Sequence, residues 1–232
     1  MRIFVPIVAI LGLLAPAAFA QSATTQTATS ATSDAPRIEL AAFPQPGKLT
    51  YAVTRDGNQI GSQVVVFQRN GDSLVVHTTV KIEVSLLGIT IYRFAHTAEE
   101  EWKGGELARL TSRTDDDGDD RVIDLKLQDG KLKGTYNGQA KEFPLGMIPA
   151  SFWHPDTVNQ TQLLDQVKAR YRKITVKDLG TEKIKIRGQQ IEAHRYSVTG
   201  QLKRELWYGP DGRLEKLQFP GKDGSEIVVI LR

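Results

Sequence analysis

The residues best suited to chemistry in this sequence are His96 and Glu100, which lie four positions apart in a segment with the pattern of a β-strand. Side chains of a strand alternate between its two faces, so both residues would share one face with Tyr92, Phe94 and Trp102. On such a face they can form a general acid–base pair, the polar anchor of a ligand cavity or a buried hydrogen-bonded pair. The sequence leaves all three interpretations open, and the buried pair is the most common of them in proteins.

The other polar motifs do not complete a catalytic or metal-binding pattern. Ser151, His154 and Asp156 have the residue types of a hydrolase triad but lack the G-x-S-x-G turn. If residues 115–120 began an EF-hand loop, Asp120 would stand where that loop requires glycine. The four histidines lack metal-ligand spacing, and the chain has no cysteine. We therefore predict neither a metal nor a cofactor, and we favour a non-enzymatic function.

The elements that must position these residues are β-strands. From Lys48 onward, alternation with period two recurs between turn dipeptides such as Asp-Gly and Asn-Gly. The clearest run is 74–86, followed after Gly88 by a second run at 89–98, and a glycine there predicts a kink or bulge in one long curved strand. Short connections between many strands predict an all-β fold, an antiparallel sheet curled into a barrel or half-barrel.

One segment, residues 144–168, interrupts the strands and is called the insertion below. It contains Pro144, Pro149 and Pro155, which cannot donate to a sheet, and Asp156 is placed to cap a helix of about ten residues. We predict that the insertion folds over the open side of the curved sheet as a lid. Its Trp153 should then be buried against the concave face, near Phe94 or Trp102.

The N-terminal residues have the pattern of an export signal. Residues 1–20 contain Arg2, a short apolar run and an Ala-Phe-Ala ending, which predicts cleavage after Ala20. Residues 21–47 are rich in Ser, Thr and Ala and predict a linker. The folded domain is predicted at 48–232, in a protein that is periplasmic or secreted.

Composition and charge exclude several classes of protein. With 40% hydrophobic and 25% charged residues, the chain is neither collagen-like nor a multi-pass membrane protein. Its net charge of +3 includes a basic stretch in which Lys183, Lys185 and Arg187 alternate with isoleucines, forming one cationic strand face. That face is typical of a solvated surface or of contact with an anionic membrane. Because the whole basic stretch, residues 170–187, contains a single aromatic residue, Tyr171, we predict no nucleic-acid binding.

Six motifs carry a resemblance to a known family over about residues 48–231. They are Tyr51-x-Val53-x-Arg55-Asp56-Gly57-x-x-Ile60-Gly61, Gly88-x-x-x-Tyr92-x-Phe94-x-His96, Glu100-x-Trp102-x-x-Gly105-x-Leu107, Ser112-x-Thr114-Asp115-Asp116, Pro149-x-Ser151-x-Trp153 and Trp207-Tyr208-x-x-x-Gly212. The sequence resembles a family of uncharacterised exported alphaproteobacterial proteins, defined as a domain of unknown function. More remotely, it is similar to periplasmic half-barrel lipoprotein carriers. The resemblance implies a curved antiparallel sheet over an apolar cavity.

These observations together predict an exported protein that binds an apolar or lipid-like ligand in its concave face. The predicted ligand-binding residues are Tyr92, Phe94, His96, Glu100, Trp102 and Trp153. Two alternatives remain open: an envelope structural or interaction protein without a small ligand, and an enzyme that uses His96 and Glu100.

Overall fold

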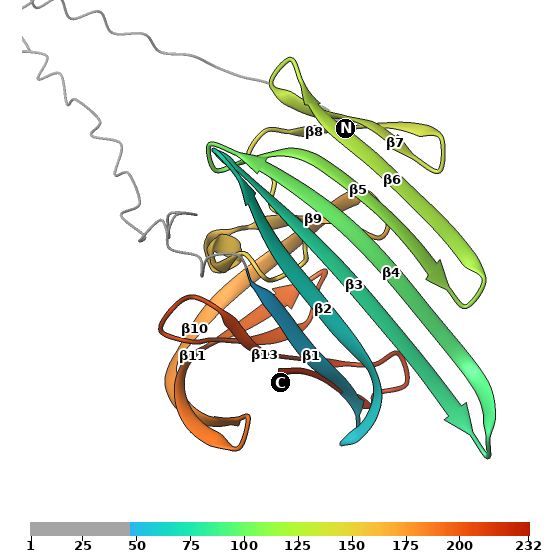
Figure 1. The fold of residues 1–232 in the computed structure, drawn as a ribbon, viewed down its shortest axis with the longest axis vertical. Coiled ribbons are helices and arrows are strands. Elements are labelled where there is room, and N and C mark those ends of the chain that lie inside the picture. The colour runs from blue at the N-terminus through green and yellow to red at the C-terminus, as the bar shows by residue number, and fades with distance from the viewer. Residues whose placement is uncertain (1–46) are drawn as a thin grey trace, which may run out of the picture. The chain divides into compact units, whose positions relative to one another are not determined.

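Fourteen strands form one antiparallel sheet in the computed structural model, which describes residues 47–232 (Figure 1). The predicted signal peptide (1–20) and nearly all of the predicted linker (21–47) lie outside these described residues. The strands are β1 (Lys48–Arg55), β2 (Asn58–Asn70), β3 (Ser73–Leu86), β4 (Ile89–Lys103), β5 (Glu106–Asp116), β6 (Asp119–Gln128), β7 (Lys131–Tyr136), β8 (Gln139–Pro144), β9 (Gln162–Asp165), β10 (Arg170–Ile186), β11 (Gln189–Gly200), β12 (Arg204–Tyr208), β13 (Leu214–Pro220) and β14 (Glu226–Leu231).

The order of the strands explains how two blocks of sequence make one sheet. Within each block, consecutive strands are neighbours, and β1 pairs with β14 to join the blocks, from Tyr51 opposite Leu231 to Arg55 opposite Ile227. Strands β8 and β9 form the two edges, so the sheet is curled but not closed. The predicted half-barrel with a short helical insertion is confirmed.

One face of the sheet carries the core and is called the inner face here. In β3 it presents Leu74 and Val76, both almost completely buried, and in β4 it presents Ala98 and Trp102. This is the face expected from the period-two alternation. Within residues 47–232, no helix is both long and apolar enough to span a membrane.

Strands β3 and β4 are joined by a tight turn at the position where the sequence predicts a kink. Leu87 and Gly88 have φ values of 50° and 80°, as in the type I′ turns that join hairpin strands. Pairing continues from this turn to Ser73 opposite Lys103. The glycine therefore reverses the chain, and the predicted single curved strand is a long hairpin.

The insertion is confirmed, but its helix is shorter than predicted. It contains one 3-10 helix, η2 (Pro155–Asn159), and residues 162–165 of the predicted helix form β9 instead. The backbone of Leu164 explains this difference, because its N–H donates to Ile148 O (2.9 Å) and its carbonyl accepts from Ala150 N (2.8 Å). Leu164 also lies opposite Tyr171 in the pairing of β9 with β10.

Candidate functional site

Glu100 lies at the contact between β4 and the insertion. Its Oε2 accepts hydrogen bonds from the indole Nε1 of Trp102 (3.1 Å) and the indole Nε1 of Trp153 (3.0 Å). The two indole rings pack edge to face with centroids 5.6 Å apart, and Phe67 packs on Trp153 at 5.4 Å. Trp153 is 2% exposed, which confirms its predicted burial near Trp102. The insertion is thus fastened to the inner face by packing and by a shared carboxylate oxygen.

Burial changes the titration of Glu100. Loss of hydration disfavours the charged form and raises the pKa of Glu100 to about 7, against the opposing effect of both indole N–H groups. The Ser151 hydroxyl also lowers this pKa, although neither Ser151 Oγ nor Glu100 Oε1 completes a hydrogen bond within residues 47–232. Near neutral pH, the carboxyl group therefore lies close to its point of half-protonation.

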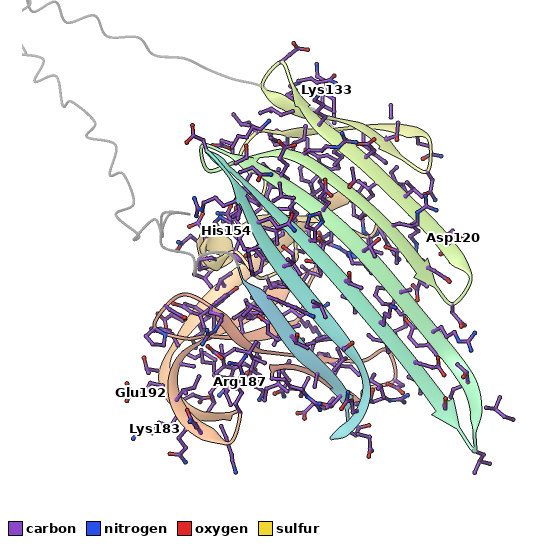
Figure 2. All side chains as sticks on the ribbon, viewed as in Figure 1. Asp120, Lys133, His154, Lys183, Arg187 and Glu192 are labelled. Atoms are coloured by element: carbon purple, nitrogen blue, oxygen red, sulfur yellow. The ribbon has the colours of Figure 1, made fainter. Side chains whose placement is uncertain are left out.

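His154, labelled in Figure 2, extends this cluster on the insertion side. Its ring lies 5.0 Å from that of Trp102 and 5.2 Å from that of Trp153, and burial lowers the pKa of His154 to about 4. His154 Nδ1 accepts the N–H of Asp156 (3.2 Å) and so caps η2. The Asp156 carboxylate binds Asn159 (2.7 Å), and within residues 47–232 the Ser151 hydroxyl completes no hydrogen bond. The three triad-type side chains are therefore not hydrogen bonded to one another.

His96 occupies a different part of β4 from Glu100. Its Nδ1 is hydrogen bonded to Thr114 Oγ1 (2.8 Å), its ring stacks on Phe94 at 6.2 Å, and it is 3% exposed. Burial lowers the pKa of His96 to about 4, so the ring is neutral at neutral pH. His96 and Glu100 share a face, as predicted. Because four residues of strand span about 13 Å, however, the two side chains are far apart and each is held by its own partners.

The inner face is less covered beyond His96, toward the turn of the β3–β4 hairpin. Phe94 and Tyr92 are half-buried, as are Ile82 and Val84 across the strand pair. The Tyr92 hydroxyl donates to Asp116 Oδ1 (2.8 Å), and burial raises the pKa of Tyr92. The six predicted residues thus form two groups, one sealed under the insertion and one along the open part of β4.

Residues 51–232 match DUF6134, a family described as a domain of unknown function. The chain belongs to the DUF6134 family. The matched range contains all six predicted site residues and the insertion, and it confirms the predicted resemblance to an uncharacterised family. No curated protein matches the sequence.

A pocket of about 510 Å³ in this DUF6134 domain was missed by sequence reasoning. It lies between η2 and strands β10 to β12, and its wall includes Asp178, His194 and Tyr196. His194 Nε2 is hydrogen bonded to Asp178 Oδ1 (2.6 Å), and the His194 ring stacks on Tyr196 at 4.8 Å.

Two signals in the sequence point to this pocket. His194 and Tyr196 are two residues apart and so share a strand face. The sequence also predicts two strands, 170–178 and 181–187, where the domain has the single strand β10 with a bulge between Asp178 and Thr181. The interruption at residues 179–180 is that bulge, which inserts one residue and changes which side chains face inward.

Proposed function

We propose that this DUF6134 domain binds an apolar or lipid-like molecule along the inner face of the β3–β4 hairpin, in the periplasm or outside the cell. One observation carries the proposal. Inner-face side chains near the insertion, such as Val76 and Trp102, are almost completely buried, whereas Phe94 and Val84 farther along the same strands are half-buried. An apolar face that its own chain covers incompletely is typical of a binding surface.

The predicted residues take three roles in this proposal. Tyr92 and Phe94 contact the ligand, and His96 supplies a polar anchor at the inner end of the surface. Within the described residues, His96 Nε2 is buried without a hydrogen-bond partner, which favours a ligand group that completes this bond. Glu100, Trp102 and Trp153 hold the insertion closed beside the ligand.

An envelope interaction protein is the second candidate, favoured by the turn of the same hairpin. Leu87, Ile89 and Ile91 are 95%, 69% and 53% exposed. Exposed apolar side chains at a hairpin end are typical of a contact with another protein. An enzyme that uses His96 and Glu100 is less favoured, because the two side chains are buried with separate partners.

Ligand binding is tested with protein purified from the producing bacterium. Lipid extraction followed by mass spectrometry should identify a bound lipid-like molecule, and a fluorescent fatty acid should bind the purified protein. Phe94→Ala should weaken that binding about tenfold through lost apolar contact. Ile91→Ala is the matched control, since Ile91 lies on the same strand but on the opposite face. If no lipid is bound and the fatty acid does not bind, or if both variants bind alike, the proposal is wrong.

The proposal includes a second contact, between an anionic membrane surface and the β10–β11 hairpin, which carries Lys183, Lys185 and Arg187. Lys183 and Lys185 are exposed, and the hairpin ends of β10–β11 and β3–β4 both point toward the lower end of the view in Figure 1. Figure 2 labels Lys183 and Arg187 there. Co-sedimentation with vesicles containing phosphatidylglycerol should fall when Lys183, Lys185 and Arg187 are changed to Gln. Equal sedimentation of this variant and the wild type would exclude the contact.

Export is tested separately from binding. Fractionation of the bacterium should place the protein in the periplasm or the medium, and N-terminal sequencing should begin at Gln21, directly after the predicted cleavage site. Recovery from the cytoplasm with Met1 intact would contradict this part of the proposal.

A further inference from the structure

The pocket between η2 and strands β10 to β12 is a second site, with lining residues different from those of the β3–β4 surface. We propose that it binds a small organic ammonium ion, through the carboxylate of Asp178 and the ring of Tyr196. Its volume of about 510 Å³ lies within the usual range for small-molecule sites, about 300–1,000 Å³.

The charge of the pocket wall favours a cation. The wall contains two aspartates, Asp156 and Asp178, and neither lysine nor arginine, although the chain has 30 Lys and Arg residues and a net charge of +3. An acidic wall in a basic protein attracts positive ligands and disfavours anionic ones.

Asp178 is fixed in position by the bulge of β10. Its Oδ1 accepts hydrogen bonds from Gly180 N (2.7 Å) and from His194 Nε2 (2.6 Å). The Gly180 and His194 hydrogen bonds lower the pKa of Asp178, so the carboxylate is charged at neutral pH. Among residues 47–232, Oδ2 has no hydrogen-bond partner and remains available to a ligand.

Aromatic rings supply the second part of the site. Tyr196 stacks on His194 at 4.8 Å and meets Tyr208 edge to face at 6.2 Å, which holds its ring at the wall. Tyr208 is fixed in turn, since its hydroxyl donates to Phe152 O (2.8 Å). A tyrosine face attracts an ammonium group through its quadrupole, and aromatic rings combined with a carboxylate form the usual receptor for alkylated ammonium ions.

The second aspartate adds negative charge from the insertion. Asp156 Oδ1 accepts from Asn159 Nδ2 (2.7 Å) and its Oδ2 from Gln160 Nε2 (2.9 Å), so its carboxylate is held in place on η2. The ligand would therefore lie between a negative charge on η2 and one on β10.

The test is titration of the purified protein with choline, followed by isothermal calorimetry and NMR. We expect choline to bind and its uncharged isostere, 3,3-dimethyl-1-butanol, to bind at least about tenfold more weakly. Phosphocholine should also bind more weakly than choline, because the pocket wall has no cation to pair with a phosphate. This comparison distinguishes a free ammonium ion from a phospholipid head group.

Variants assign the binding to the pocket. Asp178→Asn keeps an oxygen that can accept the Gly180 and His194 hydrogen bonds but removes the charge, and should weaken choline binding at least about threefold. Tyr196→Ala should weaken it by about two- to thirtyfold, whereas Tyr196→Phe retains the ring and should bind normally. Asp120→Asn, the same change on the exposed end of β6, should have no effect. Circular dichroism checks that each variant is folded.

The proposal is overturned by no binding of choline to the folded protein, by equal binding of choline and its uncharged isostere, or by unchanged binding to Asp178→Asn. None of them bears on the fatty-acid experiment, because the probe and the varied residues differ. Loss of choline binding in Tyr196→Phe would assign recognition to the hydroxyl and also contradict a site based on the ring face.

Discussion

Replacing Glu100 with glutamine should change the pH dependence of the stability of this domain. In the native protein, burial raises the pKa of Glu100 to about 7, whereas in the unfolded chain it returns to its ordinary value near 4.5. Between these values the native state keeps a proton that the unfolded state releases. The Glu100 contribution to the free energy of unfolding is therefore fully present below about pH 4.5 and is lost as the pH rises through about 7.

The size of the effect follows from the two pKa values. Each pH unit in this interval costs about 1.4 kcal/mol, so the native state loses about 3 kcal/mol between about pH 4.5 and about pH 8. Glutamine fills nearly the same space and does not titrate. The difference in unfolding free energy between Glu100→Gln and the wild type should thus shift by about 3 kcal/mol in favour of the variant over that range.

His96 and His154 act in the opposite direction but do not obscure this difference. Burial lowers the pKa of both to about 4, so their contribution is present above about pH 6.5 and is lost as the pH falls toward 4. Both histidines are present in both proteins, and their contributions largely cancel in the comparison.

The assay is urea unfolding followed by circular dichroism, at pH steps between about 4.5 and 8. Glu192→Gln is the matched control, because Glu192 is exposed on the β10–β11 hairpin, and its difference from the wild type should stay constant with pH. A constant difference for Glu100→Gln as well would refute the reasoning, since it would mean that burial does not hold a proton on Glu100.

Three further predictions concern stability. Trp153→Ala should lower the free energy of unfolding by about 3–5 kcal/mol in urea titrations and open the site to an apolar dye; unchanged stability without dye binding would exclude a fastened insertion. Between about pH 6.5 and 4, the His154→Asn variant should lose about 3 kcal/mol less unfolding free energy than the wild type. An equal loss in both proteins would show that burial does not lower the pKa of His154. Gly61→Ala should destabilise the β2–β3 pair, because the added Cβ would lie 2.1 Å from Lys81 O; an unchanged melting temperature would contradict that close approach.

The sequence was sufficient to predict most of the strands and, in 74–86, the face that the side chains occupy. Alternation in 74–86 places Leu74, Val76 and Thr78 inward, and the structure buries all three. Trp153 was also predictable, because an apolar cluster in a proline-rich segment has to be buried somewhere. These predictions depend on the alternation of side chains along a strand and on the burial of apolar residues, and both can be recognised in the sequence.

The partners of the polar groups were not predictable from the same pattern. Glu100 and His96 share a face, but Glu100 binds Trp153 of the insertion, 53 residues away, whereas His96 binds Thr114 on β5. The length of η2 depends likewise on the pairing of Leu164 with β10, a tertiary contact that overrides the local preference for helix. Polar contacts therefore required the structure, whereas apolar burial did not.

The insertion links the two proposed sites through adjacent residues. Trp153 packs on Trp102 in the inner face, and Pro155, only two residues later, lies in the wall of the pocket with Asp178. Two residues of chain reach about 7 Å at most, so Trp153 cannot move far from Glu100 without also moving η2 and its Asp156. If both proposals hold, a ligand that displaces the insertion will alter the acidic wall of the pocket, and Trp153→Ala will change choline affinity as well as stability. Unchanged choline binding in a folded Trp153→Ala protein would show that the two sites act separately.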